Sequence, residues 1–447
     1  MSNNLALKKG LNIPIKGVAA PVVIKTVTPD VVAVKPTDFT GLVPRLLVKE
    51  GDAVQAGSPV MADKMHSEIL FTSPVSGTVQ EIVRGAKRKL LAVLVKADVK
   101  QVYVDFGKEA PKDAAQVKEL LLKTGLWGAL IQRPYGVMAS LDAAPKAIFI
   151  STFSTAPLAA DTDYVLGDAL TDVQAGITAL SKVAPVHVSI HKGESAFVKL
   201  KDAQIHVVSG PHPAGNVGVQ ISHIAPICKG DTVWTVSLAG LVAIGKLFTT
   251  GRYDVRRKVA VTGPMALQPS YVDTLPGTPM KDLAAYFGNT PAEELRVIGG
   301  DALSGKVIGA AGYLGFFDTQ VTILREGTDP ELLGWIRPFR FNQFSADRSY
   351  FSWLLPKKKY AMDTNLHGGA RAFLMNDGYY GKVLPMDIFP VFLAKACLAG
   401  DIEKMEKFGI YEVLPEDLAT CEFVDPSKNN IQAMIEQGID LMLKEMA

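Results

Sequence analysis

The chain has 447 residues, of which 48% are apolar and 21% are charged, and its formal net charge is +2. This is the composition of a globular protein of several domains, without an electrostatic bias that would make nucleic acid an expected partner. The three cysteines, Cys228, Cys397 and Cys421, form no Cys-x-x-Cys pair, so this chain alone cannot build a cysteine-ligated zinc site or iron–sulfur cluster.

A β-rich unit is predicted for residues 1–98. Between residues 48 and 79, short apolar runs alternate with turn residues, among them Gly51, Gly57 and Gly77. This pattern is typical of a small all-β sandwich. It resembles the barrel-sandwich hybrid fold of biotinyl and lipoyl carrier domains.

Lys64 is the one candidate for the lysine that carrier domains present on an exposed hairpin. The run before it, residues 58–62, is too short to match the carrier hairpin in register. We therefore expect a solvated turn lysine in a carrier-type fold without carrier chemistry. A biotinylated or lipoylated Lys64 is the alternative.

The second unit, residues 99–258, is predicted to hold a Rossmann-like, doubly wound parallel sheet. A helix with Val117 and Leu121 on its apolar side is expected to end at Gly125. Asp168 is a plausible N-cap for a second helix. The pattern predicts strands at residues 147–151, 186–190 and 204–208, extends the helix capped by Asp168 to residue 180, and predicts a further helix at 238–247. A strand at residues 259–262, just past this unit, is expected to return to the same sheet.

Two smaller units are expected to follow, which makes the chain a multidomain α/β protein. Residues 259–328 suit a β-grasp module of the SLBB type, and residues 329–447 suit a mainly helical domain that begins with aromatic and basic loops. In the first, strands are expected at residues 297–298 and 321–323, and a helix at 279–287. In the second, helices are expected at residues 387–398, 401–408, 415–419 and 431–445.

Membrane spans and a secretion signal are both unexpected. The most apolar stretch, residues 233–248, is interrupted by polar residues and glycines and falls short of about 18 apolar residues. The first ten residues lack the apolar core of a signal peptide, so a cytoplasmic location is predicted. The basic run Lys357 to Lys359 follows the apolar residues 350–355, and a solvated edge is its simplest interpretation.

Residues 210–218 form the loop of greatest interest. The loop contains Gly210, His212 and Gly215 and directly follows a predicted strand, at the sheet edge where α/β proteins bind ligands. It does not match a Gly-x-Gly-x-x-Gly fingerprint. A rigid proline-containing turn and a binding loop are both open interpretations, and His212 is the first histidine to test.

A second loop, residues 124–136, carries Trp127, Arg133 and Tyr135 where a flavin phosphate loop needs bare backbone. We expect a filled, non-binding loop. His187 and His191 share one face of a predicted strand, but no carboxylate or cysteine accompanies them, so no metal site is expected. No hydrolase or nucleotide-binding motif is present, and no catalytic residue is assigned.

Five segments, together with the order of the four units, resemble the A-subunit family of the sodium-translocating NADH:quinone oxidoreductases. The family is related to the flavin- and cluster-bearing subunit of Rnf complexes and to the flavin-binding subunit of complex I. The segments are residues 8–17, 210–215, 243–251, 383–390 and 416–428. The chain keeps Cys421 alone near its C-terminus, with Asp425 where family members often have a second cysteine.

The resemblance implies a peripheral subunit on the cytoplasmic face of the inner membrane, docked on integral membrane subunits. The whole complex would oxidise NADH, reduce ubiquinone and export Na+. This chain would act at the quinone-reduction end without a redox cofactor of its own, because FMN and iron–sulfur centres are expected in partner subunits. Ubiquinone is then a possible substrate, and Gly210, His212 and Gly215 mark a loop that binds either the quinone or a partner subunit. The alternatives are a degenerate flavin-dependent NADH dehydrogenase and a purely structural assembly subunit.

Overall fold

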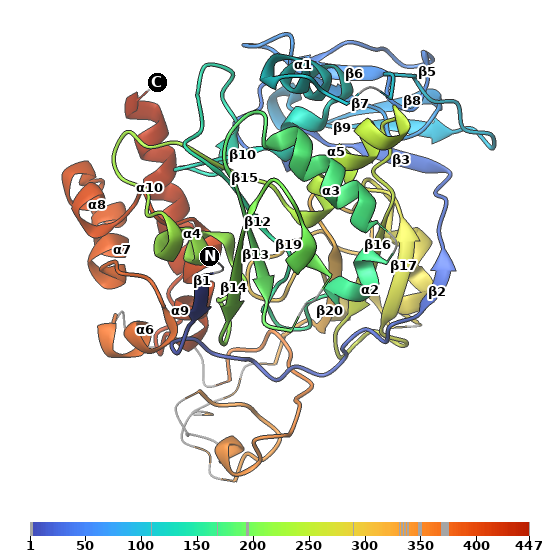
Figure 1. Ribbon diagram of the computed structural model, residues 1–447. Helices are drawn as coiled ribbons and strands as arrows, with labels where there is room; N and C mark the ends of the chain where they lie inside the picture. The colour runs from blue at the N-terminus through green and yellow to red at the C-terminus, as the bar shows by residue number, and fades with distance from the viewer. Residues whose placement is uncertain are drawn as a thin grey trace.

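The computed structural model describes the chain except residues 1, 2, 109, 168, 194, 195, 289, 330, 332, 333, 335, 336, 338, 347–350, 368–374 and 447. Within the described residues, strands form four sheets, and helices from the C-terminal part cover one side of the largest sheet (Figure 1). The predicted multidomain α/β architecture is confirmed.

Two small sheets form the barrel-sandwich unit. Their strands pair antiparallel, in the orders β3-β9-β8-β5 and β4-β6-β7. The strands are β3 (Val31–Val34), β4 (Pro44–Leu46), β5 (Ala53–Val54), β6 (Pro59–Asp63), β7 (Leu70–Thr72), β8 (Gly77–Arg84) and β9 (Leu90–Ala97). A Cβ on Gly77 would lie 1.9 Å from the Lys96 carbonyl oxygen, so the pairing of β8 with β9 requires glycine there. Lys64 is exposed directly after β6, as expected of a turn lysine.

The seven-stranded sheet has the order β1-β14-β13-β12-β15-β10-β11. From β1 to β15 the neighbouring strands are parallel, as the Rossmann-like prediction requires, whereas β10 and β11 add an antiparallel edge. The strands are β1 (Asn3–Ala6), β10 (Ile131–Arg133), β11 (Val137–Met138), β12 (Ile148–Ser151), β13 (Val186–His191), β14 (Gln204–Ser209) and β15 (Val233–Thr235). Strand β1 belongs to this sheet although it precedes the barrel-sandwich strands in the chain.

Helices cover both faces of this sheet. Helix α3 (Leu170–Leu180) and helix α5 (Leu238–Thr250) pack on the face that carries Ile148 and Val188. Helix α4 (Val217–Ile224) and the C-terminal helices pack on the opposite face. Helix α1 (Ala114–Thr124) ends at Gly125, whose φ of +81° is the predicted left-handed cap. The proposed cap Asp168 lies outside the described residues, and a short helix, α2 (Thr162–Leu166), precedes it.

The six-stranded sheet has the order β19-β18-β20-β16-β17-β2. Its strands are β2 (Val23–Thr26), β16 (Arg257–Thr262), β17 (Ser270–Thr274), β18 (Leu295–Gly299), β19 (Lys306–Val307) and β20 (Gln320–Arg325). The strand predicted at residues 259–262 therefore pairs here rather than in the seven-stranded sheet. The helix predicted at residues 279–287 is the 3-10 helix η5 (Met280–Tyr286). Strand β2 enters from the N-terminal segment and pairs parallel with β17.

The C-terminal part is helical, as predicted. Its elements are α6 (Asp377–Val383), α7 (Pro390–Ala399), α8 (Ile402–Phe408), the 3-10 helix η9 (Pro415–Leu418), α9 (Ala419–Val424) and α10 (Ile431–Met446). The Asp401 side chain caps α8 by accepting a hydrogen bond from the Lys404 backbone N–H at 3.1 Å. Left-handed glycines, Gly400 and Gly409, end α7 and α8. Among the described residues, the helices are all too short or too polar to span a bilayer.

Candidate functional site

The loop singled out in the sequence connects β14 to α4 at the carboxyl end of the parallel strands, where it was predicted to lie. Gly210 has a φ of +147°, and a Cβ there would lie 2.7 Å from the Leu7 carbonyl oxygen. The close approach arises because the chain after β1 continues alongside, with the Leu7 N–H donating to the Ser209 carbonyl at 2.8 Å. Glycine is thus required for the loop to leave the sheet edge beside Leu7.

The backbone of His212 is clamped by the N-terminal segment. Its N–H donates to Asn12 Oδ1 at 3.0 Å, and its carbonyl accepts from the Leu11 N–H at 2.7 Å. Gly10 lies against the same carbonyl, because a Cβ on Gly10 would come within 2.4 Å of the His212 oxygen. The peptide bond between His212 and Pro213 is cis. Residues 10–12 therefore fix the position of His212, with Asn12 lying 200 residues away from it in sequence.

His212 is buried, with 3% of the residue exposed, and its imidazole lies against Thr155, which follows β12. Its Nδ1 lies 3.2 Å from Thr155 Oγ1, which also accepts a hydrogen bond from the Gly215 N–H at 2.9 Å. Burial lowers the pKa of His212, and the carboxylates of Asp301 and Asp417 oppose this shift. The ring is therefore neutral near pH 7 and has one donor and one acceptor nitrogen.

Gly215 is held by residues that follow β12. A Cβ on Gly215 would lie 2.5 Å from the Thr155 backbone nitrogen. The loop can therefore lie this close to Thr155 only because residue 215 is a glycine. Ser151 Oγ lies 3.0 Å from the Gly215 carbonyl oxygen and accepts a hydrogen bond from Gln220 Nε2 at 3.0 Å. The buried Gln220 amide oxygen has no hydrogen-bond partner among the described residues. Gly210, His212 and Gly215 thus form one tightly packed unit.

A buried ion pair lies beside this unit. Arg133 Nη1 donates to Asp417 Oδ2 at 3.0 Å, and Nη2 donates to Glu416 Oε1 at 2.8 Å. Only 2% of the Arg133 side chain and none of the Asp417 side chain is exposed. A Cβ on Gly218, in the first turn of α4, would overlap both charged groups. The pair ties the antiparallel edge of the seven-stranded sheet to the C-terminal helices, and the 284-residue separation of Arg133 from Asp417 left no local signal in the sequence.

The second loop of interest, residues 124–136, is filled by its own side chains, as predicted. Trp127 is fully buried, and its Nε1 donates to the Ala139 carbonyl at 2.9 Å. Its ring packs edge-to-face on Trp234 with centroids 5.4 Å apart. Tyr135, at a φ of +84°, packs against Tyr411. Trp127 and Arg133 are therefore both buried side chains of this loop.

His187 and His191 share one face of β13, as predicted, and the partners of His187 come from the strands on either side, β12 and β14. His187 Nδ1 lies 2.9 Å from His206 Nε2, and Phe149 stacks on His187 with ring centroids 4.8 Å apart. Burial lowers the pKa of both His187 and His206. Within the part of the chain that the structure describes, no group of three or more His, Cys, Asp or Glu side chains is arranged to hold a metal.

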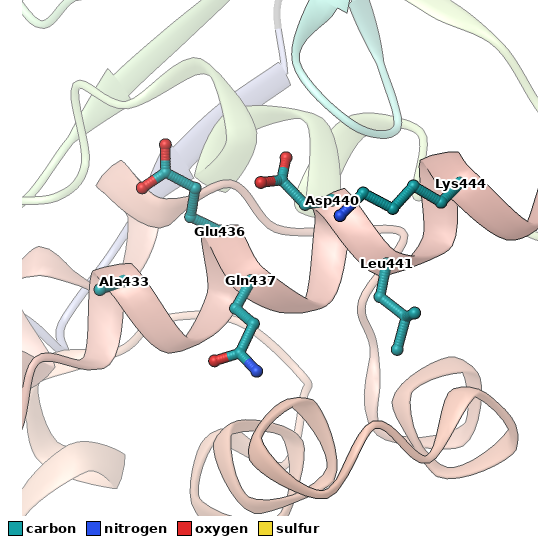
Figure 2. A pocket seen from close by; sticks show the side chains of 6 residues that line it. All are labelled: Ala433, Glu436, Gln437, Asp440, Leu441 and Lys444. Atoms are coloured by element: carbon teal, nitrogen blue, oxygen red, sulfur yellow. The ribbon is translucent and has the colours of Figure 1, made fainter.

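Two hollows lie away from the 210–215 loop. The larger, of about 410 Å³, runs along the outer side of α10 (Figure 2). There Glu436 and Asp440 point to one side of the helix and Gln437 and Leu441 to the other. The smaller, of about 30 Å³, lies where the barrel-sandwich unit meets Tyr253 and Phe316. The first is open and charged, and the second is too small for a quinone ring, so neither replaces the loop as the candidate site.

Comparisons with known proteins agree with this layout. Three family models match the chain: the NqrA N-terminal barrel-sandwich hybrid domain at residues 5–98, the NqrA second alpha/beta domain at 112–253, and the NQRA C-terminal domain at 258–309. The A-subunit of the Na(+)-translocating NADH-quinone reductase of Pasteurella multocida is 36% identical over 99% of this chain and 100% of its own length. This chain belongs to the A-subunit family. The resemblance stated from sequence is confirmed.

Other members of the family match over similar lengths. The Neisseria meningitidis A-subunit is 34% identical over 99% of this chain and all of its own length. The Serratia proteamaculans protein is 37% identical over 95% of this chain and 96% of its own length. A solved NAD+-reducing NiFe hydrogenase aligns with a TM-score of 0.35 and 11% identity over 72% of this chain and 64% of its own, a likeness too weak to carry an argument.

Proposed function

We propose that this chain is a peripheral subunit of a complex that oxidises NADH, reduces ubiquinone and exports Na+, on the cytoplasmic face of the inner membrane. It acts at the quinone-reduction end and holds no redox cofactor of its own, so FMN and iron–sulfur centres belong to partner subunits, some of them integral membrane proteins. Family membership supports the place in the complex. The observation that supports the quinone role is the position of the buried His212 imidazole, whose pKa is lowered by burial, at the carboxyl edge of the parallel sheet.

His212 has the chemistry to recognise a quinone carbonyl. In the tautomer in which Thr155 Oγ1 donates to Nδ1, the neutral ring carries its proton on Nε2, where it can donate a hydrogen bond worth about 0.5–1.5 kcal/mol. Because the ring is only 3% exposed, the headgroup reaches it only after a local displacement of the residues packed on it.

A purely structural role is the second candidate, and one observation favours it. Both backbone polar groups of His212 are bonded to residues 11 and 12, and the ring contacts Thr155, so His212 also has what a structural anchor needs. In that case the loop joins the N-terminal segment to the sheet edge and binds no quinone.

Two substitutions separate these roles, because each places a polar atom near a different nitrogen of the imidazole ring. His212→Asn keeps a polar atom near the Nδ1 position, so the Thr155 contact and the thermal midpoint should be nearly retained. His212→Gln places its amide near the Nε2 position. Equilibrium binding of a ubiquinone analogue to the isolated full chain should therefore weaken several-fold in His212→Asn and less in His212→Gln.

His223→Gln is the matched control, because His223 is exposed on α4 and away from the loop. It should bind the analogue as wild type does. Unaltered binding in His212→Asn and His212→Gln, with a lowered midpoint in either, would reject the quinone role and leave the structural one.

A further inference from the structure

Exposed apolar side chains gather on one projecting segment of the chain. Residues 339–346 and 351–355, in the orange part at the bottom of Figure 1, extend below the sheets. Five described side chains on it are large, apolar and exposed by 42–72%: Phe339, Phe341, Trp353, Leu354 and Leu355. Single exposed apolar residues are ordinary, but a cluster of this kind marks an interaction surface. We call these five residues the apolar tip.

The apolar tip has an internal framework. The rings of Phe339 and Phe341 each stack on Phe351 with centroids 5.9 Å apart. Ser352 is buried, and its Oγ accepts a hydrogen bond from the Ser345 N–H at 3.0 Å. Trp353 and Leu354 belong to the 3-10 helix η8 (Ser352–Leu354), which turns them outward while Ser352 points inward.

The end of this segment is anchored to the body of the protein. Tyr360 is buried, and its N–H donates to the Pro14 carbonyl at 2.8 Å. The Tyr360 carbonyl in turn accepts from the Lys16 N–H at 2.9 Å. The chain that follows the apolar tip therefore returns to the body of the protein beside the N-terminal segment.

The charge around the apolar tip is positive. Lys357 and Lys359 are exposed directly after Leu355, and Lys358 lies between them with its Nζ donating to the Phe341 carbonyl. Residues 337–360 contain six Lys and Arg and a single acidic residue, Asp347. Arg337 and Arg340 pair with Glu331, which leaves the three lysines as the main local excess of charge.

We propose that the apolar tip and Lys357 to Lys359 bind the surface of an anionic phospholipid bilayer. Trp353 and the two leucines would enter the boundary between headgroups and acyl chains, where aromatic residues concentrate. The lysines would contact the lipid phosphates. A protein partner fits less well, because the cores of protein interfaces are depleted in lysine. The inference rests on the peripheral location proposed above and is independent of the quinone role.

Vesicle flotation of the full chain tests this surface. Binding to vesicles of phosphatidylcholine with about 30% phosphatidylglycerol should be about tenfold or more tighter than binding to phosphatidylcholine alone. About 0.5 M NaCl should weaken the binding to anionic vesicles, because salt screens the lysines. The basic variant Lys357→Gln/Lys359→Gln should bind anionic vesicles about tenfold or more weakly. The apolar variant Trp353→Ser/Leu354→Ser/Leu355→Ser should lose binding at both low and high salt.

Matched controls exist elsewhere on the surface. Lys87→Gln/Lys89→Gln removes two exposed charges from the turn between β8 and β9. Phe389→Ser/Phe392→Ser removes two exposed rings at the start of α7. Both should bind vesicles as wild type does, and all variants should keep the wild-type thermal midpoint.

The proposal is wrong if the wild-type chain does not bind anionic vesicles, or binds both lipid mixtures equally. It is also wrong if the tip variants bind vesicles like wild type, or if the control variants lose as much vesicle binding as the tip variants. If the tip variants float normally but no longer assemble with the other subunits, the tip is a protein interface and the lipid proposal is wrong. Quinone-analogue binding is measured without vesicles, so its failure is distinguishable from failure of the lipid surface.

Discussion

Several buried side chains of this protein contact residues that belong to another structural unit of the chain. Arg133 is the strongest example, because its guanidinium is buried between the seven-stranded sheet and the carboxylates of Glu416 and Asp417. A buried ion pair adds little net stability by itself, but removal of one partner leaves an uncompensated charge. Such a residue is replaceable only together with its partner.

Arg133→Met should accordingly lower the free energy of unfolding by about 3–5 kcal/mol, because Asp417 stays buried without a cation. Urea unfolding of the full chain measures this change. Lys146→Met breaks an exposed pair with Asp231 and should alter stability by less than about 1 kcal/mol. The double variant Arg133→Met/Asp417→Leu should recover part of the loss, and a double variant less stable than Arg133→Met would contradict the argument.

Three histidines with lowered pKa values should make the free energy of unfolding fall at acid pH. Because burial lowers the pKa of His187, His206 and His212 below the ordinary value of about 6.5, the unfolded chain binds more protons than the native chain as pH falls below that value. Their contribution to stability is thus present above about pH 6.5 and is lost on acidification. The slope reaches at most about 1.4 kcal/mol per pH unit for each histidine.

His206→Gln should therefore flatten the dependence of unfolding free energy on pH between about pH 7.5 and 5.5, whatever it does to stability at neutral pH. His223→Gln, on the exposed side of α4, is the matched substitution with which the slope is compared. Denaturant titrations at several pH values give the slopes. An identical slope in wild type and His206→Gln would assign the acid sensitivity to other groups.

At the scale of elements, close approaches of backbone decide where glycine is required. Gly77 begins β8, and its missing side chain lets β8 pair with β9 across the Lys96 carbonyl. Gly381, within α6, has no neighbouring atom within 4 Å of a built Cβ. The same substitution should therefore have opposite effects at these two positions.

Gly77→Ala should destabilise the barrel-sandwich unit by about 1–3 kcal/mol, because a backbone oxygen must shift to admit the methyl group. Gly381→Ala should be neutral or stabilising by up to about 1 kcal/mol, since alanine is the better helix former. Thermal unfolding of both variants decides the matter. Equal midpoints for the two variants would mean that the Lys96 carbonyl moves aside for the methyl group of Gly77→Ala without a loss of stability.

Elements defined by local periodicity were predictable, and those defined by distant partners were not. Strands β12, β13 and β14 and helices α7, α8 and α10 lie close to their predicted positions, because buried apolar runs and caps signal them locally. The sequence has no such signal for β1 and β2, whose partners β14 and β17 lie far along the chain. The helices expected at residues 279–287 and 415–419 are 3-10 helices, a distinction that apolar spacing over so few residues does not make.

Some features of the candidate site were also predictable from the sequence, and others were not. The position of Gly210, His212 and Gly215 at the sheet edge follows from their place after a predicted strand. Their surroundings do not, because Asn12, Thr155 and Asp417 come from three distant parts of the chain. The sequence did not predict that His212 is buried. Because it is buried, a structural role is the main alternative to quinone binding.

At the scale of the whole molecule, the N-terminal segment joins units that lie far apart in the chain. Strand β1 lies at the edge of the seven-stranded sheet, residues 10–12 clamp the His212 loop, and β2 completes the six-stranded sheet. Between them, Ile15 bridges to Tyr360 at the end of the segment that carries the apolar tip. All of these contacts precede the barrel-sandwich strands, so this short stretch orients the later units around one another.

Deletion of residues 1–12 should loosen the sheet edge and the loop without unfolding the barrel-sandwich unit. Strand β14 would lose its parallel neighbour, and His212 would lose both backbone partners. Hydrogen exchange should then show reduced protection of β14 amides by about 1 kcal/mol or more, while β8 and β9, which pair with each other and with β5 and β3, keep theirs as an internal control. Unchanged protection of β14 would mean that β1 covers the sheet edge without stabilising it. Equal loss in β9 would mean that the chain unfolds as one unit, and that the N-terminal segment stabilises every part of the protein.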